Sequence, residues 1–175
     1  MSSNNLKNFG IICKGKSLLG LPEIEKKFDR CYIINKFEKE LYHFENIFKK
    51  KKITQFVNRI RTAAMQKKTY RHFKINNIQM AAPFKLFDKK FMISYLIYQY
   101  FGLKIKTMSK SFLHKFHYTG KDAYKEKFPN TGILSILYVA EILKVENIYI
   151  IGLDFYTGAY LYKTETSNPV EITHQ

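Results

Sequence analysis

Polar side chains capable of chemistry follow a predicted strand near the end of the sequence. The strand is residues 147–151 (NIYII), a β-branched and aromatic run bounded by a charged turn and by Gly152. The polar residues that come after it are Asp154, Tyr156, Tyr160 and Tyr162. Ligands of open α/β sheets bind beyond the carboxyl ends of strands, and tyrosine hydroxyls can donate hydrogen bonds to developing negative charge. This segment is therefore the first candidate for a ligand site.

A second polar group follows the first predicted strand, residues 9–13. Lys14, Gly15 and Ser17 form a short turn before a helix that we expect near residues 22–28. A glycine turn between a strand and a helix is a common place for the phosphate or sugar of a nucleotide. The turn has one glycine and matches neither GxGxxG nor the P-loop pattern, so by itself it predicts only a strand-to-helix connection.

Asparagines follow the second and third predicted strands, residues 31–34 and 52–57. Asn35 and Asn58 each offer a hydrogen-bond donor and an acceptor, which suits contact with the edge of a base or a sugar. Asparagine is also a common turn residue, and that reading stays open.

The elements that must position these residues are readable from periodicity. Thr131 is the expected N-cap of a helix, with Gly132 just inside it. The apolar residues of this helix recur at three-and-four spacing, at Ile133, Ile136, Leu137, Ala140 and Leu143. A helix that feeds strand 147–151 through a short turn is half of a βαβ crossover, which predicts a parallel sheet.

The remaining sequence completes an α/β pattern. We expect strands at 75–80 and 103–107, helices at 88–101 and 109–117, and a loop or short helix at 119–128. The sequence therefore predicts an α/β fold: a single Rossmann-like domain over residues 1–162, with a mostly parallel twisted sheet flanked by helices. Residues 163–175 are predicted to be a polar tail.

Composition indicates a globular protein with an anionic partner. Of 175 residues, 46% are hydrophobic, while 30 Lys and Arg against 14 Asp and Glu give a formal charge of +16. Such a balance suits a nucleic acid, a nucleotide-linked donor or an acidic membrane face. The alternative is a surface of solvated lysines.

Other features bear on compartment and metal binding. Cys13 and Cys31 lack CxxC spacing, so we interpret them as buried thiols in a reducing compartment. The sequence has neither the apolar core of a signal peptide nor an apolar run of ~20 residues, which favours the cytoplasm, with peripheral contact at the inner membrane as an alternative. His114 and His117 have the spacing of a helical metal pair, but no third ligand is evident, so an ordinary amphipathic face is favoured and no metal is expected.

These residues together resemble a known family. Thr131-Gly132 and, after a helix of matching length, Ile148 to Tyr156 (IYIIGLDFY) are similar to the bacterial sialyltransferases of the Campylobacter type, glycosyltransferase family 42. Gly15 with Ser17, Asn35 with Phe37, and Asn58 match earlier motifs of that family in the same order. The middle third of the sequence does not align.

The resemblance implies a GT-A-like variant of the Rossmann-like fold and a specific reaction. Members transfer sialic acid from CMP-sialic acid to a hydroxyl of an acceptor glycan or glycolipid, as in lipooligosaccharide biosynthesis, with inversion and without a metal ion or other cofactor. Carried over to this sequence, the donor-binding residues would be Lys14, Gly15, Ser17, Asn35, Asn58, Asn130, Thr131 and Gly132. Tyr156, with Tyr160 or Tyr162, would donate hydrogen bonds to the leaving phosphate, Asp154 would anchor the turn, and His174 would be the general base.

The sequence also departs from the family pattern. Lys14 stands in place of an asparagine, Phe128 in place of an arginine, and His174 comes sooner than the family's histidine, so that the tail reads as a remnant of a lid. Three hypotheses follow: a sialyltransferase-like enzyme, a non-catalytic nucleotide- or sugar-binding relative, and a basic nucleic-acid-binding protein. Contact with an anionic membrane and homo-oligomerisation stay open.

Overall fold

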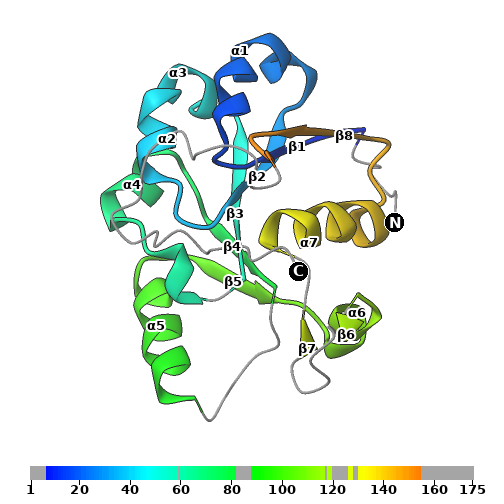
Figure 1. The fold of residues 1–175 in the computed structure, drawn as a ribbon. Coiled ribbons are helices and arrows are strands. Elements are labelled where there is room, and N and C mark those ends of the chain that lie inside the picture. The colour runs from blue at the N-terminus through cyan, green and yellow to red at the C-terminus, as the bar shows by residue number, and fades with distance from the viewer. Residues whose placement is uncertain are drawn as a thin grey trace, which may run out of the picture.

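The computed structural model describes residues 7–58, 60–81, 88–116, 118–119, 126–127 and 130–154. Within these ranges, six parallel strands form one sheet in the order β5-β4-β3-β2-β1-β8 (Figure 1). The strands of this sheet are β1 (Asn8–Ile12), β2 (Arg30–Ile34), β3 (Lys52–Val57), β4 (Asn77–Met80), β5 (Lys104–Thr107) and β8 (Asn147–Ile151). Two short antiparallel strands, β6 (Tyr118–Thr119) and β7 (Glu126–Lys127), form a separate pair. The α/β class and the parallel sheet are thus confirmed.

Helical segments connect the strands. The α-helices are α1 (Leu21–Ile24), α2 (Glu38–His43), α3 (Glu45–Phe48), α4 (Lys67–His72), α5 (Lys89–Tyr100), α6 (Lys110–Lys115) and α7 (Thr131–Tyr138). The 3-10 helices are η1 (Lys16–Gly20), η2 (Glu25–Lys27) and η3 (Ile60–Ala63), and α7 continues into a π-helical segment, η4 (Val139–Leu143). In the part of the chain described, no helix combines the length and apolar composition needed to cross a bilayer.

The inner strands are buried on both faces, as their near-continuous apolar sequences require. Ile12, Ile33 and Val57 pack into a core shared with α1 to α5. Their neighbours Ile11 and Ile34, together with other side chains of the opposite face, pack against α6 and α7. Figure 1 shows these two helical layers, with α1 to α5 on one side of the sheet and α6 and α7 on the other. The alternating direction of strand side chains therefore builds two cores from one sheet.

Most predicted boundaries agree with the structure. Strands 52–57 and 147–151 match β3 and β8, and the other four predicted strands differ from observed ones by one or two residues. Asp88 caps α5 through Oδ1, which accepts from the Phe91 amide at 3.0 Å, and Gly102 ends the helix with φ +83°. The helix predicted at 109–117 is α6.

Three predictions need correction or fall short. The N-cap of α7 is Asn130, not Thr131, because the Asn130 side chain reaches back to accept from the Ile133 amide at 2.9 Å. In segment 119–128, predicted as a loop or short helix, Thr119 belongs to β6 and Glu126–Lys127 form β7, while the other residues of the segment lie outside the described residues. The sequence analysis missed α2, α3 and α4. The predicted domain end at residue 162 and the tail 163–175 lie outside the described residues.

Candidate functional site

The order of the strands reverses at β1 and β8. From β1 the sheet extends through β2, β3, β4 and β5 on one side, and α7 then returns the chain to β8 on the other side of β1. Helices leave β1 and enter β8 on opposite faces of the sheet. Such a reversal of strand order is a topological switch point, which is where doubly wound sheets bind ligands.

An aspartate ties the two strand ends together. The Asp154 carboxylate accepts from the Ser17 amide at 3.2 Å and from the Ser17 hydroxyl. The same hydroxyl oxygen accepts from the Gly152 amide at 3.1 Å. The prediction that Asp154 anchors the turn is therefore confirmed, and its partner is the turn after β1. Ser17 uses its hydroxyl inside this turn, so its first role is to hold the two loops in register.

Small residues allow these loops to approach each other. The Gly15 amide donates to the Gly152 carbonyl at 2.7 Å. A Cβ atom on Gly15 would lie 2.2 Å from Asp154 Oδ2, and one on Gly152 would lie 2.2 Å from the carbonyl oxygen of Cys13. Gly152 also has φ +73°, a conformation that side chains disfavour. Only glycine fits at either position without displacing backbone or carboxylate.

The start of α7 packs against the same two strand ends. A Cβ atom on Gly132 would lie 2.8 Å from the Leu153 side chain and 3.3 Å from Cys13 Sγ, so the first turn of α7 packs directly on both strand ends. Thr131 is buried, and Asn130 is half-buried as the N-cap. A helix N-terminus at this position favours a negatively charged ligand group. Segments 13–17, 130–132 and 152–154, which are distant in sequence, thus meet at one place.

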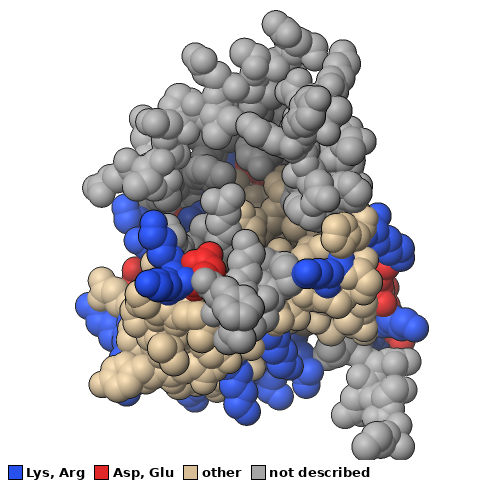
Figure 2. All heavy atoms as spheres, turned by 90° about the horizontal axis from the view of Figure 1, so that it is seen from below, with Lys and Arg blue, Asp and Glu red and all other residues tan. Residues whose placement is uncertain are grey.

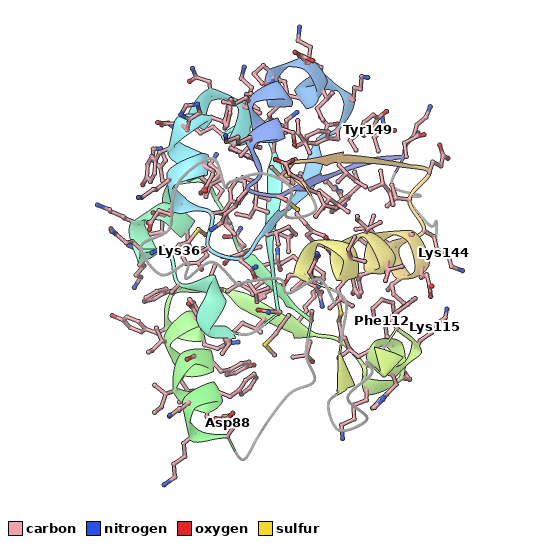
Figure 3. The ribbon with its side chains drawn as sticks, viewed as in Figure 1. Lys36, Asp88, Phe112, Lys115, Lys144 and Tyr149 are labelled. Atoms are coloured by element: carbon pink, nitrogen blue, oxygen red, sulfur yellow. The ribbon has the colours of Figure 1, made fainter. Side chains whose placement is uncertain are left out.

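Charged side chains lie beside this place, at the end of β2. The half-buried Lys14 ammonium interacts electrostatically with the Glu40 carboxylate and with the Lys36 ammonium. Burial lowers the pKa of Lys14, Glu40 acts in the opposite direction and Lys36 acts in the same direction as burial. Glu40 is almost fully buried on α2, and Lys36 is exposed and points toward the α2 side of the sheet (Figure 3). The Lys14 ammonium thus lies between a buried carboxylate and a second positive charge.

The two predicted asparagines lie along the same edge. Asn35 directly follows β2 and has φ 59°. Its main chain makes two hydrogen bonds. The amide donates to the Phe56 carbonyl at 2.8 Å, and the carbonyl accepts from the side-chain Nε2 of Gln55 at 2.7 Å. Asn58 follows β3 and is exposed. Because β2 and β3 are parallel neighbours, both asparagines lie at the carboxyl edge, as expected from their positions after strands.

A buried polar network fixes this part of the edge. Gln55 is fully buried in β3, and its Nε2 also donates to the Ala63 carbonyl at 3.1 Å. The Tyr70 hydroxyl lies 2.8 Å from Gln55 Oε1 and 2.6 Å from the Ala63 carbonyl, to which it can donate. Burial raises the pKa of Tyr70, so the phenol stays a neutral donor. Gln55 therefore couples the Asn35 turn to η3.

The structure brings together eight of the predicted residues along one sheet edge. These are Lys14, Gly15, Ser17, Asn35, Asn58, Asn130, Thr131 and Gly132. The predicted catalytic residues Tyr156, Tyr160, Tyr162 and His174 lie outside the described residues, as do His117 and Phe128. Their roles stay predictions.

Both cysteines are free and buried, as predicted. Burial, with a smaller effect of the Asp154 carboxylate, raises the pKa of the Cys13 thiol to about 12. Burial also raises the pKa of Cys31 to about 12, against a smaller opposite effect of Lys51. Neither thiol is therefore a ready nucleophile. Within the described ranges, no group of three or more His, Cys, Asp and Glu is arranged to hold a metal ion.

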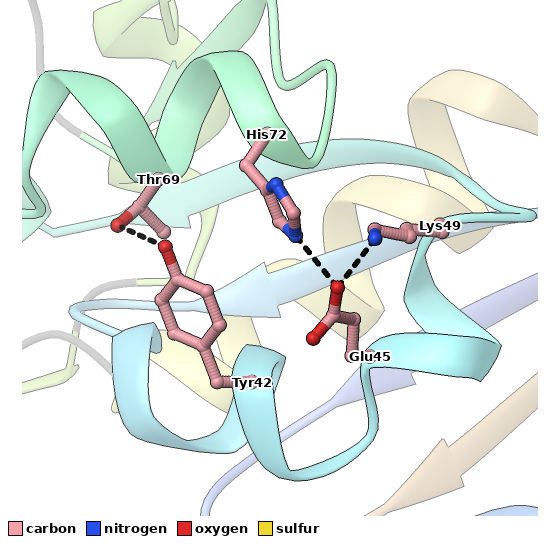
Figure 4. Close-up of polar contacts among 5 residues, drawn as sticks. All are labelled: Tyr42, Glu45, Lys49, Thr69 and His72. Atoms are coloured by element: carbon pink, nitrogen blue, oxygen red, sulfur yellow. Dashed lines mark hydrogen bonds and ion pairs between the residues drawn. The ribbon is translucent and has the colours of Figure 1, made fainter.

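A second polar cluster lies away from this edge and joins α3 to α4 (Figure 4). Glu45 Oε1 lies 2.8 Å from His72 Nε2 and also contacts Lys49. The hydrogen bonds from Lys49 and then from His72 lower the pKa of Glu45. The Tyr42 ring stacks on His72 at 5.7 Å, beside an open hollow of about 450 Å³ lined by residues 42–47. We interpret this exposed cluster as a tie between helices, because its polar groups bind one another and the hollow is lined by a single short segment.

Sequence reasoning missed one residue of the candidate site, Glu40. Asn130 was predicted as a donor-binding residue, but its role as the N-cap of α7 was assigned to Thr131. Glu40 was missed with the whole of α2, although Phe37, Leu41, Phe44 and Phe48 have helical spacing and are all buried. Comparison of the chain with protein-family models, with curated protein sequences and with solved structures gave no match.

Proposed function

We propose that this protein binds a CMP-sugar across the carboxyl edge of its sheet and transfers the sugar, as a sialyltransferase-like glycosyltransferase. The observation that supports the proposal is the meeting of segments 13–17, 130–132 and 152–154 at a topological switch point. The same three segments carry most of the resemblance to the CMP-sialic acid-dependent family. The finer GT-A-like assignment is part of this proposal.

The donor would lie along the strand ends. Neighbouring strands are about 4.8 Å apart, so the ends of β8, β1, β2 and β3 span roughly 14 Å. The phosphate would lie at Lys14, next to the α7 N-terminus, and Asn35 and Asn58 would contact the cytidine or the sugar. Lys14 stands where the family has an asparagine, and it would contribute charge rather than a paired donor and acceptor.

The transfer chemistry requires charge stabilisation and a base. CMP leaves as a phosphate monoester, and hydrogen bonds from Tyr156 and from Tyr160 or Tyr162 would stabilise the charge that develops on it. His174 would take the proton of the acceptor hydroxyl. These two roles need no metal ion or cofactor. Tyr156→Phe would then lower turnover roughly ten- to a thousandfold with the midpoint of thermal unfolding unchanged.

Selective stabilisation by CMP is the first test. A ligand that binds the native state raises the midpoint of thermal unfolding, so CMP should raise it more than UMP, AMP or GMP, at low and at high salt. Equal and salt-sensitive effects of all four nucleotides would contradict the proposal. Turnover of CMP-sialic acid then separates an enzyme from a protein that only binds the nucleotide.

Lys14 allows a sharper test of the phosphate position. Lys14→Met should weaken binding of CMP roughly tenfold and leave binding of cytidine unchanged, because only CMP carries the phosphate. Lys16→Met is the matched control, since Lys16 is exposed two residues further along. Equal losses for CMP and cytidine would place the phosphate elsewhere.

A non-catalytic relative is the second candidate. It is favoured by the replacement of the family's asparagine by Lys14 and by the engagement of the Ser17 hydroxyl with Asp154 and Gly152. This candidate predicts CMP-selective stabilisation without turnover of CMP-sialic acid.

A further inference from the structure

Helix α5 exposes a stripe of large apolar side chains. Ile93 is 60% exposed, Leu96 60%, Ile97 46% and Tyr100 78%. These positions are spaced i, i+3, i+4 and i+7, so they share one face of the helix. The described residues contain eight exposed large hydrophobic side chains, and half of them lie on this one helix. Single exposed apolar residues are ordinary, but a contiguous stripe marks an interaction surface.

Only the opposite face of α5 packs against the core of the protein. Phe91 and Tyr98 are buried in the core on that side, and Phe91 stacks on Tyr95 at 6.1 Å. The helix is therefore apolar around most of its circumference, a pattern that normally belongs to a helix covered on all sides. The exposed stripe is not needed for packing against the sheet.

Lysines flank the stripe. Lys89 and Lys90 are exposed at its beginning, and Lys67 Nζ lies 4.1 Å from the centre of the Tyr100 ring at its end. Because α5 leads into the parallel strand β5, it runs antiparallel to the strands, and Lys89 and Lys90 therefore lie at the carboxyl edge of the sheet. Figure 3 shows Asp88 at this beginning of the helix.

The stripe belongs to the half of the chain that carries the net charge. Between Asn46 and Lys121 the sequence has 18 Lys and Arg and a single acidic residue, Asp88. The rest of the chain has 12 Lys and Arg and 13 Asp and Glu, and is nearly neutral. In the view from below, from the end where α5 begins, more Lys and Arg than Asp and Glu side chains are visible (Figure 2). Basic residues thus predominate in the part of the sequence that contains the apolar stripe.

We propose that the α5 face binds the surface of a lipid bilayer rich in anionic headgroups. The stripe residues Ile93, Leu96 and Ile97 would enter the boundary between headgroups and acyl chains, and the flanking lysines would contact the headgroups. Aliphatic side chains gain free energy from hydrocarbon but not from stacking on bases, so a bilayer fits this face better than a nucleic acid. A second copy of the chain fits less well, because it would bring like charges together at both ends of the stripe.

Vesicle binding tests the proposal directly. The full chain should sediment with vesicles of phosphatidylcholine and phosphatidylglycerol, and much less with vesicles of phosphatidylcholine alone. Ile93→Ser with Leu96→Ser should lower partitioning roughly tenfold or more at every salt concentration, because apolar burial is lost. Lys89→Gln with Lys90→Gln should lower it about tenfold at low salt and less at high salt.

Two control variants separate this face from general properties of the chain. Ile142→Ser changes another aliphatic side chain that is 50% exposed, on η4. Lys26→Gln with Lys27→Gln removes two adjacent exposed lysines on η2, in the nearly neutral half. Both controls should bind vesicles as the unchanged protein does. Midpoints of thermal unfolding, and their rise with CMP, should be the same in all these variants, so failure of the proposed nucleotide site would not affect this result.

Three outcomes would overturn the proposal. The first is equal binding to both kinds of vesicle, or binding to neither. The second is a protein that sediments as a dimer, becomes a monomer in the α5 serine variant, and does not bind vesicles. The third is tight binding of a random-sequence oligonucleotide that is lost in the same variant, again without vesicle binding.

Discussion

At the carboxyl ends of β1 and β8, three chain segments meet so closely that only glycine fits at two positions, whereas α5 leaves four large apolar side chains in water. The first region satisfies its polar groups internally, through Ser17, Asp154 and backbone amides. The second region has an apolar face that the fold does not use. From this difference we infer that closely packed strand ends indicate a ligand site that is already formed. An exposed apolar helix face indicates a surface that binds a separate partner.

The largest expected difference between the packed strand ends and α5 comes from replacing one glycine with positive φ in each region by alanine. Gly152→Ala should cost about 3 kcal/mol or more, because strain is added to a collision with the Cys13 carbonyl. Gly102→Ala, at the end of α5, should cost only about 1 kcal/mol, because no atom lies within 4 Å of the added group. Urea unfolding of both variants measures the two costs. If both substitutions lowered the free energy of unfolding equally, Gly152 would not lie in close contact with the Cys13 carbonyl.

The Ser17–Asp154 contact can be compared with a surface ion pair. Asp154→Ala should destabilise the protein by roughly 1–3 kcal/mol, because the Ser17 amide and hydroxyl lose their acceptor. Glu141→Ala, which removes an exposed contact with Lys115 on α6, should cost less than about 1 kcal/mol. A double-mutant cycle of Ser17→Ala and Asp154→Ala, measured by urea unfolding, gives the coupling energy. Additive costs at these two positions would contradict the proposed tie.

Alkaline pH should lower the free energy of unfolding, because two thiols are buried in the folded chain. Cys13 and Cys31 have pKa values of about 12 in the folded chain against 9.0 for an ordinary cysteine. Above that ordinary value the unfolded chain loses these protons first, so the folded state binds more protons and stability falls as pH rises. The slope is roughly 1.4 kcal/mol per pH unit for each thiol. Urea unfolding as a function of pH measures it, and Cys31→Ala should remove about half of the thiol contribution. A flat profile in this range would contradict the burial of both groups.

The smallest expected effect concerns the α5 face. Leu96→Ser should change the free energy of unfolding by less than about 0.5 kcal/mol, because the side chain is mostly in water both before and after unfolding. Leu134→Ser in α7 is the comparison, since Leu134 is buried between the helix and the sheet and its replacement should cost about 2 kcal/mol or more. A large loss for Leu96→Ser would show that α5 has a structural role on its exposed side.

Elements whose ends are set by local sequence signals could be predicted from the sequence, and elements that depend on tertiary contacts could not. Strands β3 and β8 were predicted with their observed ends because their β-branched and aromatic runs are bounded by local turn signals. The α2 to α4 region was missed because its helices have six residues or fewer, and the helical spacing of Phe37, Leu41, Phe44 and Phe48 runs across two of them. Tertiary contacts hold them, such as the hydrogen bond from the Gln66 amide, just before α4, to the Glu38 carboxylate at 3.2 Å.

The candidate site was predictable in composition but not in detail. Gly15, Ser17 and Gly132 could be selected because strand ends and helix starts converge in parallel sheets. The Ser17–Asp154 bond joins residues 137 positions apart, and no local pattern encodes such a pairing. The α5 stripe was hidden for the opposite reason: Phe91 and Leu96 are both apolar, and only the structure shows which of the two faces the sheet.

The position of β1 has a consequence for how the chain is made. Its second partner in the sheet is β8, so that Asn8 pairs with Asn147 across 139 residues of sequence. At a synthesis rate of roughly 5–20 residues per second, one edge of β1 stays unpaired for about 7–28 s after it is made. An unpaired strand edge of this kind is open to wrong partners, which gives folding chaperones a defined interval in which to protect this chain. The pairing of β1 with β8 is therefore the last part of the sheet to form on the ribosome.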